Sequence, residues 1–60
     1  SRKNITYEKI DLIVPEKRDE LIADLKQRTG IDVIRVEVRR IDFLRDTANL
    51  RIFYYEKDTD

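Results

Sequence analysis

The sequence contains no cysteine and no histidine, and it has one glycine, one proline and a serine only at its first position. Without Cys or His, the chain lacks disulfides, the usual ligands of structural zinc and the usual groups of covalent catalysis. One glycine is too few for a phosphate-binding loop of the Walker or dinucleotide-binding type. We therefore expect a protein that is not an enzyme and that uses no cofactor or metal.

Charge is abundant but balanced, with 13 basic and 13 acidic side chains that make up 43% of the chain. No overall field directs such a chain toward nucleic acid or anionic lipid. No apolar run approaches the ~18 residues that cross a membrane, so we expect no direct membrane insertion of this segment. The lack of Cys favours a reducing cytoplasm.

Residues 1–60 are expected to form a single small domain. A chain of this size buries only about 60% of the surface that its unfolded form exposes, so its stability should be marginal. Disulfides, metals or oligomerisation usually compensate, and the first two lack their residues here. We expect a partner, either a second copy or a larger parent protein. The first residue, Ser1, fits a fragment of a longer protein or a chain that has lost its Met, and both alternatives stay open.

The first third of the chain is expected to form a strand with an interruption. Ile5 and Tyr7 alternate with polar neighbours, whereas the apolar positions from Ile10 to Val14 alternate on the opposite parity. A bulge or tight turn near residues 8–9 would bring both sets to one core.

A helix is predicted from about Pro15 to Thr29. Proline suits the first helical position, and Gly30 supplies the left-handed residue that commonly closes a helix. Ile31 is expected to pack back on Leu25, as in a Schellman motif.

The predicted helix has one apolar stripe, formed by Leu21, Ile22 and Leu25. Asp24 can pair with Arg28 one turn later, and the acidic and basic ends complement the helix dipole. These charges are explained by helix stability.

Two alternating segments, residues 32–38 and 48–55, are predicted to form a hairpin. On the core side the register pairs Ile34 with Tyr54, Val36 with Ile52 and Val38 with Leu50, and on the outer side it pairs Val33 with Tyr55, Arg35 with Phe53 and Glu37 with Arg51. The outer pairs include a cation–π contact and an ion pair. The apolar segment 41–47 is either a continuation of the strand after a bulge at Arg39–Arg40, which we favour, or a loop folded onto the core. The charged tail from Glu56 to Asp60 is expected to fray.

The resulting fold class is α+β. The element order is that of a β-α-β-β split unit, half of a ferredoxin-like fold, in which a three-stranded antiparallel sheet carries one helix on one face. The third strand is expected between the first and the second, because it is the most apolar.

One surface is a candidate contact face, on the side of the hairpin opposite the core. Its residues are Val33, Arg35, Glu37, Arg51, Phe53 and Tyr55. Arginines and aromatics anchor protein interfaces, and they also form stacking platforms for single-stranded nucleic acid. Zero net charge and Glu37 within the patch make nucleic acid the unlikely partner. A third interpretation is that the cross-strand pairs only stabilise a solvated face.

Asp42 and Asp46 are a pair of carboxylates that superficially resembles a cation site. Their spacing and neighbours do not match a calcium loop. We interpret Asp46 and Thr47 as turn-forming residues and Arg45 as an ion-pair partner of Asp42.

Three successive segments give a resemblance to a known family. They are ITYEKIDLI, PEKRDELIADLKQRTG and IDVIRVEVRRIDFLRDTANLRIFYY. Together they resemble the C-terminal cytoplasmic domain of a family of bacterial integral membrane proteins, which is a domain of unknown function. The motif residues include Thr29, Gly30, Asp42, Leu44, Arg45, Asp46, Thr47 and Ala48.

The resemblance implies a detached cytoplasmic domain that sits at the inner face of the bacterial cell membrane as part of a membrane protein. It transfers no catalytic residue. The leading hypothesis is a non-enzymatic regulatory or interaction domain, with the parent membrane protein or a homo-oligomer as partner. The alternatives are a small-molecule sensor that dimerises like amino-acid-regulatory domains and, third, a sheet that binds RNA.

Overall fold

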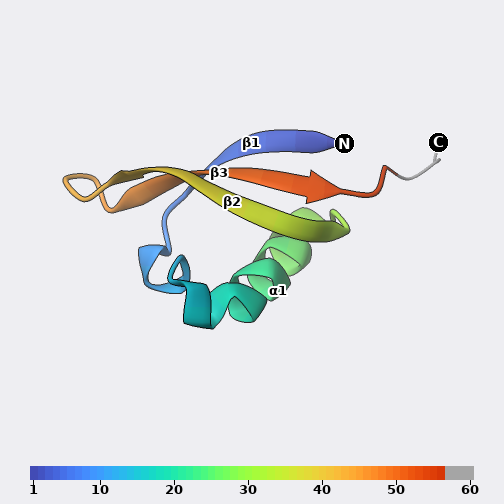
Figure 1. The fold of residues 1–60 in the computed structure, drawn as a ribbon, viewed down its shortest axis with the longest axis horizontal. Coiled ribbons are helices and arrows are strands. Elements are labelled where there is room, and N and C mark those ends of the chain that lie inside the picture. The colour runs from blue at the N-terminus through green and yellow to red at the C-terminus, as the bar shows by residue number, and fades with distance from the viewer. Residues whose placement is uncertain (57–60) are drawn as a thin grey trace.

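The computed structural model describes residues 1–56, in which a three-stranded sheet lies on one helix (Figure 1). The elements are β1 (Arg2–Tyr7), the 3-10 turns η1 (Ile10–Leu12) and η2 (Pro15–Lys17), α1 (Arg18–Thr29), β2 (Val33–Asp42) and β3 (Thr47–Tyr54). The sheet is antiparallel in the order β1-β3-β2. The predicted α+β split unit is confirmed, with the third strand in the centre. The tail from Glu56 to Asp60 was predicted to fray, and residues 57–60 of this tail lie outside the described residues.

The connection from the sheet to the helix differs from the prediction. β1 ends at Tyr7, where an interruption was expected, but the next apolar residues form the turn η1 rather than more strand. In that turn the Leu12 N–H donates to the Lys9 carbonyl at 3.0 Å. The chain must leave the sheet to reach the helix layer, and a tight turn does so while Ile10 and Leu12 still pack on the core. Helical turns begin at Pro15, as predicted, but the α-helix itself begins at Arg18.

The helix ends where the sequence predicts, although its end has a different hydrogen-bond pattern. Gly30 adopts the left-handed conformation with φ 72°, and its N–H donates to the Lys26 carbonyl at 2.9 Å. This single bond defines an αL motif rather than the expected Schellman motif. The reason is that the Thr29 hydroxyl accepts the Ile31 N–H at 3.0 Å while it donates to the Leu25 carbonyl at 2.6 Å. Ile31 packs against the core, as expected.

The β2–β3 register is confirmed in its centre and wrong at its start. Residues 35 to 38 face residues 53 to 50 as predicted, and a shift between Val38 and Arg40 lets β2 continue to Asp42. The favoured bulge at 39–40 is therefore present. A second bulge at Ile34, which the sequence analysis did not predict, pairs Val33 with Tyr54. Because one extra residue reverses the parity of the strand, Val33 is buried and Ile34 is 49% exposed.

The core lies between α1 and one face of the sheet. Its buried side chains are Tyr7, Leu21, Leu25, Val33, Val36, Ala48, Leu50 and Ile52. Each fully buried aliphatic side chain contributes about 1.5–3 kcal/mol. Arg18 ties the helix to the edge of the sheet, since its guanidinium donates to the carbonyls of Val36 at 2.9 Å and Ile13 at 3.2 Å. The opposite face of the sheet has no covering element among the described residues.

Candidate functional site

The face of the sheet opposite α1, which we call the open face, carries all five arginines of the strands. Cα pairing and strand alternation place its residues together: Arg2, Asn4 and Thr6 from β1, Asn49, Arg51 and Phe53 from β3, and Arg35, Glu37, Arg39, Arg40 and Asp42 from β2. Five arginines therefore share this face with two carboxylates. A chain that is neutral overall thus presents a basic surface on one side.

Four of the six predicted contact residues lie together on the open face: Arg35, Glu37, Arg51 and Phe53. Val33 does not, because the bulge at Ile34 turns its side chain into the core, where it is 1% exposed. Tyr55 lies one residue beyond β3 and is exposed. Val33 was therefore wrongly assigned to the predicted contact face. The open face also includes Arg2, Asn4 and Thr6 of β1, which the prediction did not contain.

The predicted cation–π contact is present, whereas the predicted ion pair is not. The Arg35 guanidinium lies 3.9 Å from the centre of the Phe53 ring. Glu37 faces Arg51 across the strands, but its carboxylate accepts from Arg35 at 2.9 Å and Arg39 at 3.2 Å. Both arginines project from the same strand on the same side, Arg39 from the bulge. Their hydrogen bonds, Arg35 first, hold the pKa of Glu37 below its usual value.

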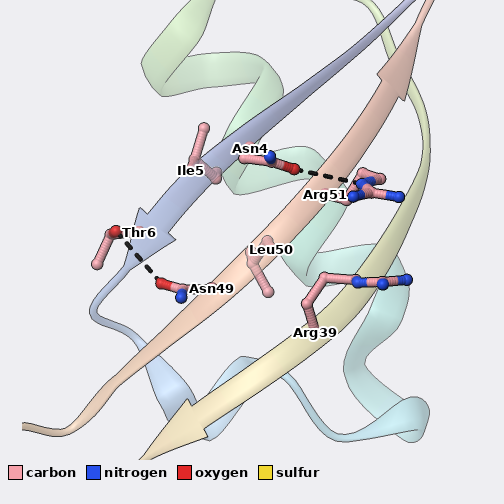
Figure 2. A pocket seen from close by; sticks show the side chains of 7 residues that line it. All are labelled: Asn4, Ile5, Thr6, Arg39, Asn49, Leu50 and Arg51. Atoms are coloured by element: carbon pink, nitrogen blue, oxygen red, sulfur yellow. Dashed lines mark hydrogen bonds between the residues drawn. The ribbon is translucent and has the colours of Figure 1, made fainter.

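Arg51 is consequently bound to an amide rather than to a carboxylate. Its Nε donates to Asn4 Oδ1 at 3.3 Å, and alongside it the Thr6 hydroxyl donates to Asn49 Oδ1 at 3.4 Å (Figure 2). The close view shows Arg51 and Arg39 extending away from β1, whereas Asn4, Asn49 and Thr6 lie on the β1 side of them. Between them lies a groove of about 330 Å³, whose lining residues are Asn4, Ile5, Thr6, Arg39, Asn49, Leu50 and Arg51.

The β2–β3 turn contains or adjoins most of the residues that carry the family resemblance. The Asp42 carboxylate accepts the Arg45 N–H at 3.1 Å and pairs with the Arg45 guanidinium at 3.3 Å, as the turn interpretation predicts. Asp46 has φ 54°, a left-handed conformation that Asp tolerates better than most residues. Leu44 at the tip is 91% exposed. The loop projects beyond the end of the sheet that the helix covers (Figure 1).

A second polar cluster, which we call the helix-side cluster, joins the end of β1 to α1. The buried Tyr7 hydroxyl donates to Asp24 at 2.6 Å, and Arg28 pairs with Asp24 at 3.2 Å, as predicted, and with Glu8 at 3.1 Å. Lys9 adds a contact to Asp24 at 3.4 Å. Arg28 also lies 5.7 Å from the centre of the Tyr7 ring. Every charge in this cluster has an opposite partner.

The pKa values of the helix-side cluster shift as this pairing requires. Burial, and then the hydrogen bond to Asp24, raise the pKa of Tyr7 well above its ordinary value. The hydrogen bond from Tyr7, followed by that from Arg28, lowers the pKa of Asp24. The hydrogen bond from Arg28 lowers the pKa of Glu8, and bonds to Glu8 and Asp24 raise the pKa of Arg28. Such shifts favour the ionised carboxylates and the neutral tyrosine, which stabilises the fold.

Comparison with known proteins places the chain in a family. The family model described as "Domain of unknown function (DUF4956)" matches residues 1–54. The chain belongs to this family. Neither the curated proteins nor the solved structures gave a match. As a DUF4956 domain, the chain has motif residues with visible structural roles: Thr29 and Gly30 end the helix, residues 43–46 form the turn between Asp42 and Thr47, and Ala48 is buried. Thr47, predicted as a turn residue, instead begins β3 and pairs with Asp42.

Sequence reasoning missed the groove of this DUF4956 domain because three of its lining residues, Asn4, Ile5 and Thr6, come from β1. Asn4 and Thr6 are polar residues of an edge strand, and only the β1–β3 register brings them beside Arg51 and Asn49. The sequence did contain one signal for their position: Asn4 and Thr6 alternate with the core residues Ile5 and Tyr7, so their side chains lie on the opposite face of the strand. Within residues 1–56, no three His, Cys, Asp or Glu side chains are grouped as metal ligands require. No helix in the described part of the chain is long and apolar enough to cross a membrane.

Proposed function

We propose that this DUF4956 domain is a non-enzymatic interaction domain at the cytoplasmic end of a bacterial membrane protein, and that the open face is its contact surface. The resemblance of the whole chain to such a tail supports the membrane context. The observation that supports the interaction role is the composition of the open face, which has five arginines, two carboxylates and a half-buried Phe53. No element among the described residues covers this face. Arginine and aromatic side chains are the residues enriched at interface centres.

The charge of the open face indicates the chemistry of the partner. Two copies stacked face to face would bring ten arginines together, and like charges in contact oppose association. Pairing of two copies through the β2 edge is also opposed. The Val36 carbonyl in the middle of this edge, which an added strand would need as an acceptor, already accepts a hydrogen bond from Arg18. A polypeptide surface rich in carboxylates fits the open face better than a second copy does. The cytoplasmic part of the parent protein is the partner that we propose.

A charge-reversal experiment in the full-length protein tests this proposal. Arg2→Glu combined with Arg40→Glu changes two exposed arginines of the open face that form no ion pair among the described residues. Lys17→Glu with Lys26→Glu is the matched control, since it makes the same charge change on the helix side. We expect the open-face variant to reduce in-cell cross-linking between the domain and the rest of the protein, and the control to leave it unchanged. Equal cross-linking in both variants would reject the contact surface.

The membrane context has its own test. The full-length reading frame should encode hydrophobic spans before residue 1, and the protein should fractionate with the inner membrane while this domain stays accessible from the cytoplasm. A soluble product would reject that part of the proposal.

A second function, binding of a small molecule, is favoured by the groove beside Arg51. RNA binding stays a third prediction. The stacking of Arg35 on Phe53 occupies the aromatic ring that a base would need. A gel-shift series across salt concentration tests it, because true phosphate contacts weaken steeply as salt rises.

A further inference from the structure

We infer that the groove beside Arg51 binds a phosphate group, supplied by a small soluble anion or by a headgroup. The inference deepens the proposed function and rests on it, because the groove lies within the open face that we propose as the contact surface. Its physical basis is the set of hydrogen-bond donors around Arg51; among these donors, Arg39 is also paired with Glu37 at 3.2 Å, whereas Arg51 has no charged partner among the described residues.

Arg51 is the central residue of this groove. It lies on the central strand, it is half-buried, and its Nε donates a hydrogen bond to Asn4 Oδ1 at 3.3 Å. Its cross-strand neighbour Glu37 is already bound to Arg35 and Arg39. Among residues 1–56, no carboxylate lies within ion-pair distance of Arg51. The two terminal nitrogens of Arg51 therefore remain for a ligand, in a guanidinium that Asn4 holds in place.

The amides beside Arg51 are oriented in a way that also favours an anion. Asn4 uses its oxygen to accept from Arg51, and Asn49 uses its oxygen to accept from the Thr6 hydroxyl. In both residues the oxygen thus accepts one hydrogen bond, and the NH₂ group, a donor, has no partner among the described residues. With Arg39 at the other side, the lining is rich in donors and poor in acceptors (Figure 2).

The dimensions and chemistry of the groove select the ligand. A volume of about 330 Å³ is at the small end of ligand sites, so a compact group fits better than an extended molecule. A guanidinium binds phosphate through two parallel N–H donors. A carboxylate would use both of its oxygens to bind Arg51. A phosphate group has further oxygens, which can accept hydrogen bonds from the asparagine amides and from Arg39. The donors come from three strands, so the intact sheet is needed to assemble them.

An NMR titration of the isotope-labelled domain tests the inference. Inorganic phosphate and pyrophosphate are the probes, and chloride at matched ionic strength is the control. We expect saturable shifts in the millimolar range confined to the Arg51 side chain, its neighbours Asn4 and Asn49, and Arg39, with pyrophosphate binding more tightly. Arg51→Gln should weaken binding about tenfold or more, because a charged hydrogen-bonding group is lost. Lys26→Gln, an equal charge change on the helix, should leave binding unchanged.

A second arm separates the sources of the phosphate. Vesicles of phosphatidylcholine with phosphatidylglycerol are sedimented with the domain and with Arg51→Gln. Binding to vesicles that depends on Arg51 would indicate a headgroup, whereas binding of pyrophosphate alone would indicate a soluble ligand. The inference is overturned by shifts that do not saturate, by shifts spread over all basic residues, or by an Arg51→Gln variant that binds as well as the parent. The cross-linking experiment changes Arg2 and Arg40, which do not line the groove, so either result can fail without the other.

Discussion

The helix-side cluster and the open face contain similar side chains but treat their charges differently. On the helix side, Tyr7, Asp24, Arg28 and Glu8 satisfy one another within 2.6 to 3.2 Å. On the open face, Glu37 is shared by two arginines of its own strand, and Arg51 is left with an amide partner. Paired charges around a buried hydroxyl stabilise a fold, whereas an unpaired guanidinium in a groove is available to a ligand. The comparison therefore separates the structural charges of this domain from its candidate functional ones.

The largest expected effect comes from removing the acceptor at the centre of the helix-side cluster. Asp24→Ala leaves the buried Tyr7 hydroxyl without its partner, and an unsatisfied buried polar group costs about 1–3 kcal/mol. Urea unfolding measures the loss. Asp11→Ala, which removes an exposed carboxylate, is the control and should change stability by less than about 0.5 kcal/mol. Equal losses in the two variants would remove the cluster's structural role.

The end of the helix should be nearly as sensitive, for a reason of backbone geometry. Gly30→Ala introduces a Cβ at φ 72°, where no atom lies within 4 Å of it, so the cost is conformational rather than steric. A left-handed alanine costs about 1–2 kcal/mol. Gly30→Asn should lose less, because Asn tolerates this conformation. If Asn is as destabilising as Ala in thermal unfolding, the geometric explanation is wrong.

The helix-side cluster should make the stability of the domain fall at both acid and alkaline pH. The lowered pKa values of Asp24 and Glu8 mean that stability is present above the ordinary carboxyl range, about 3.9–4.3, and is lost as the pH falls through the folded values. The raised pKa of Tyr7 means that stability is lost as the pH rises above about 10. Tyr7→Phe should flatten the alkaline side of a stability profile. An unchanged alkaline decline in that variant would contradict the role of Tyr7.

The smallest expected effect on stability lies on the open face. Arg51→Gln removes one hydrogen bond to Asn4 at a half-buried site, and we expect the unfolding free energy to change by no more than about 0.5 kcal/mol. A circular-dichroism melt beside the parent protein measures it. A loss as large as that of Asp24→Ala would mean that Arg51 is structural.

Much of this fold follows from local signals. Pro15, Gly30 and the alternation of residues 35–38 and 50–53 are short-range patterns, and the structure has the elements that they predict. The bulge at Ile34 left no such signal, because Val33 and Ile34 are both apolar and either can face the core. Packing against Tyr54 and α1 decides between them, and this decision depends on tertiary contacts.

The candidate site was less predictable, for a related reason. The register predicts that Glu37 faces Arg51 across the strands. That Glu37 instead pairs with Arg35 and Arg39 depends on how the side chains lie around the bulge at residue 39. The groove further requires Asn4 and Thr6, which approach only when β1 joins β3. Pairs within one hairpin can be predicted from alternation, whereas a site shared by three strands requires the assembled sheet.

The most direct test of the distinction between the two regions is the unfolding free energy of the parent protein and of Arg51→Gln, each with and without pyrophosphate at constant ionic strength. A ligand that binds only the folded state raises this free energy by RT ln(1 + [L]/Kd), where [L] is the concentration of free ligand. Without pyrophosphate, we predict that the stabilities of the two proteins differ by no more than about 0.5 kcal/mol. With pyrophosphate, we predict a rise in the parent protein alone. A larger destabilisation of Arg51→Gln without ligand, or an equal rise in both proteins, would contradict the assignment of Arg51 to binding.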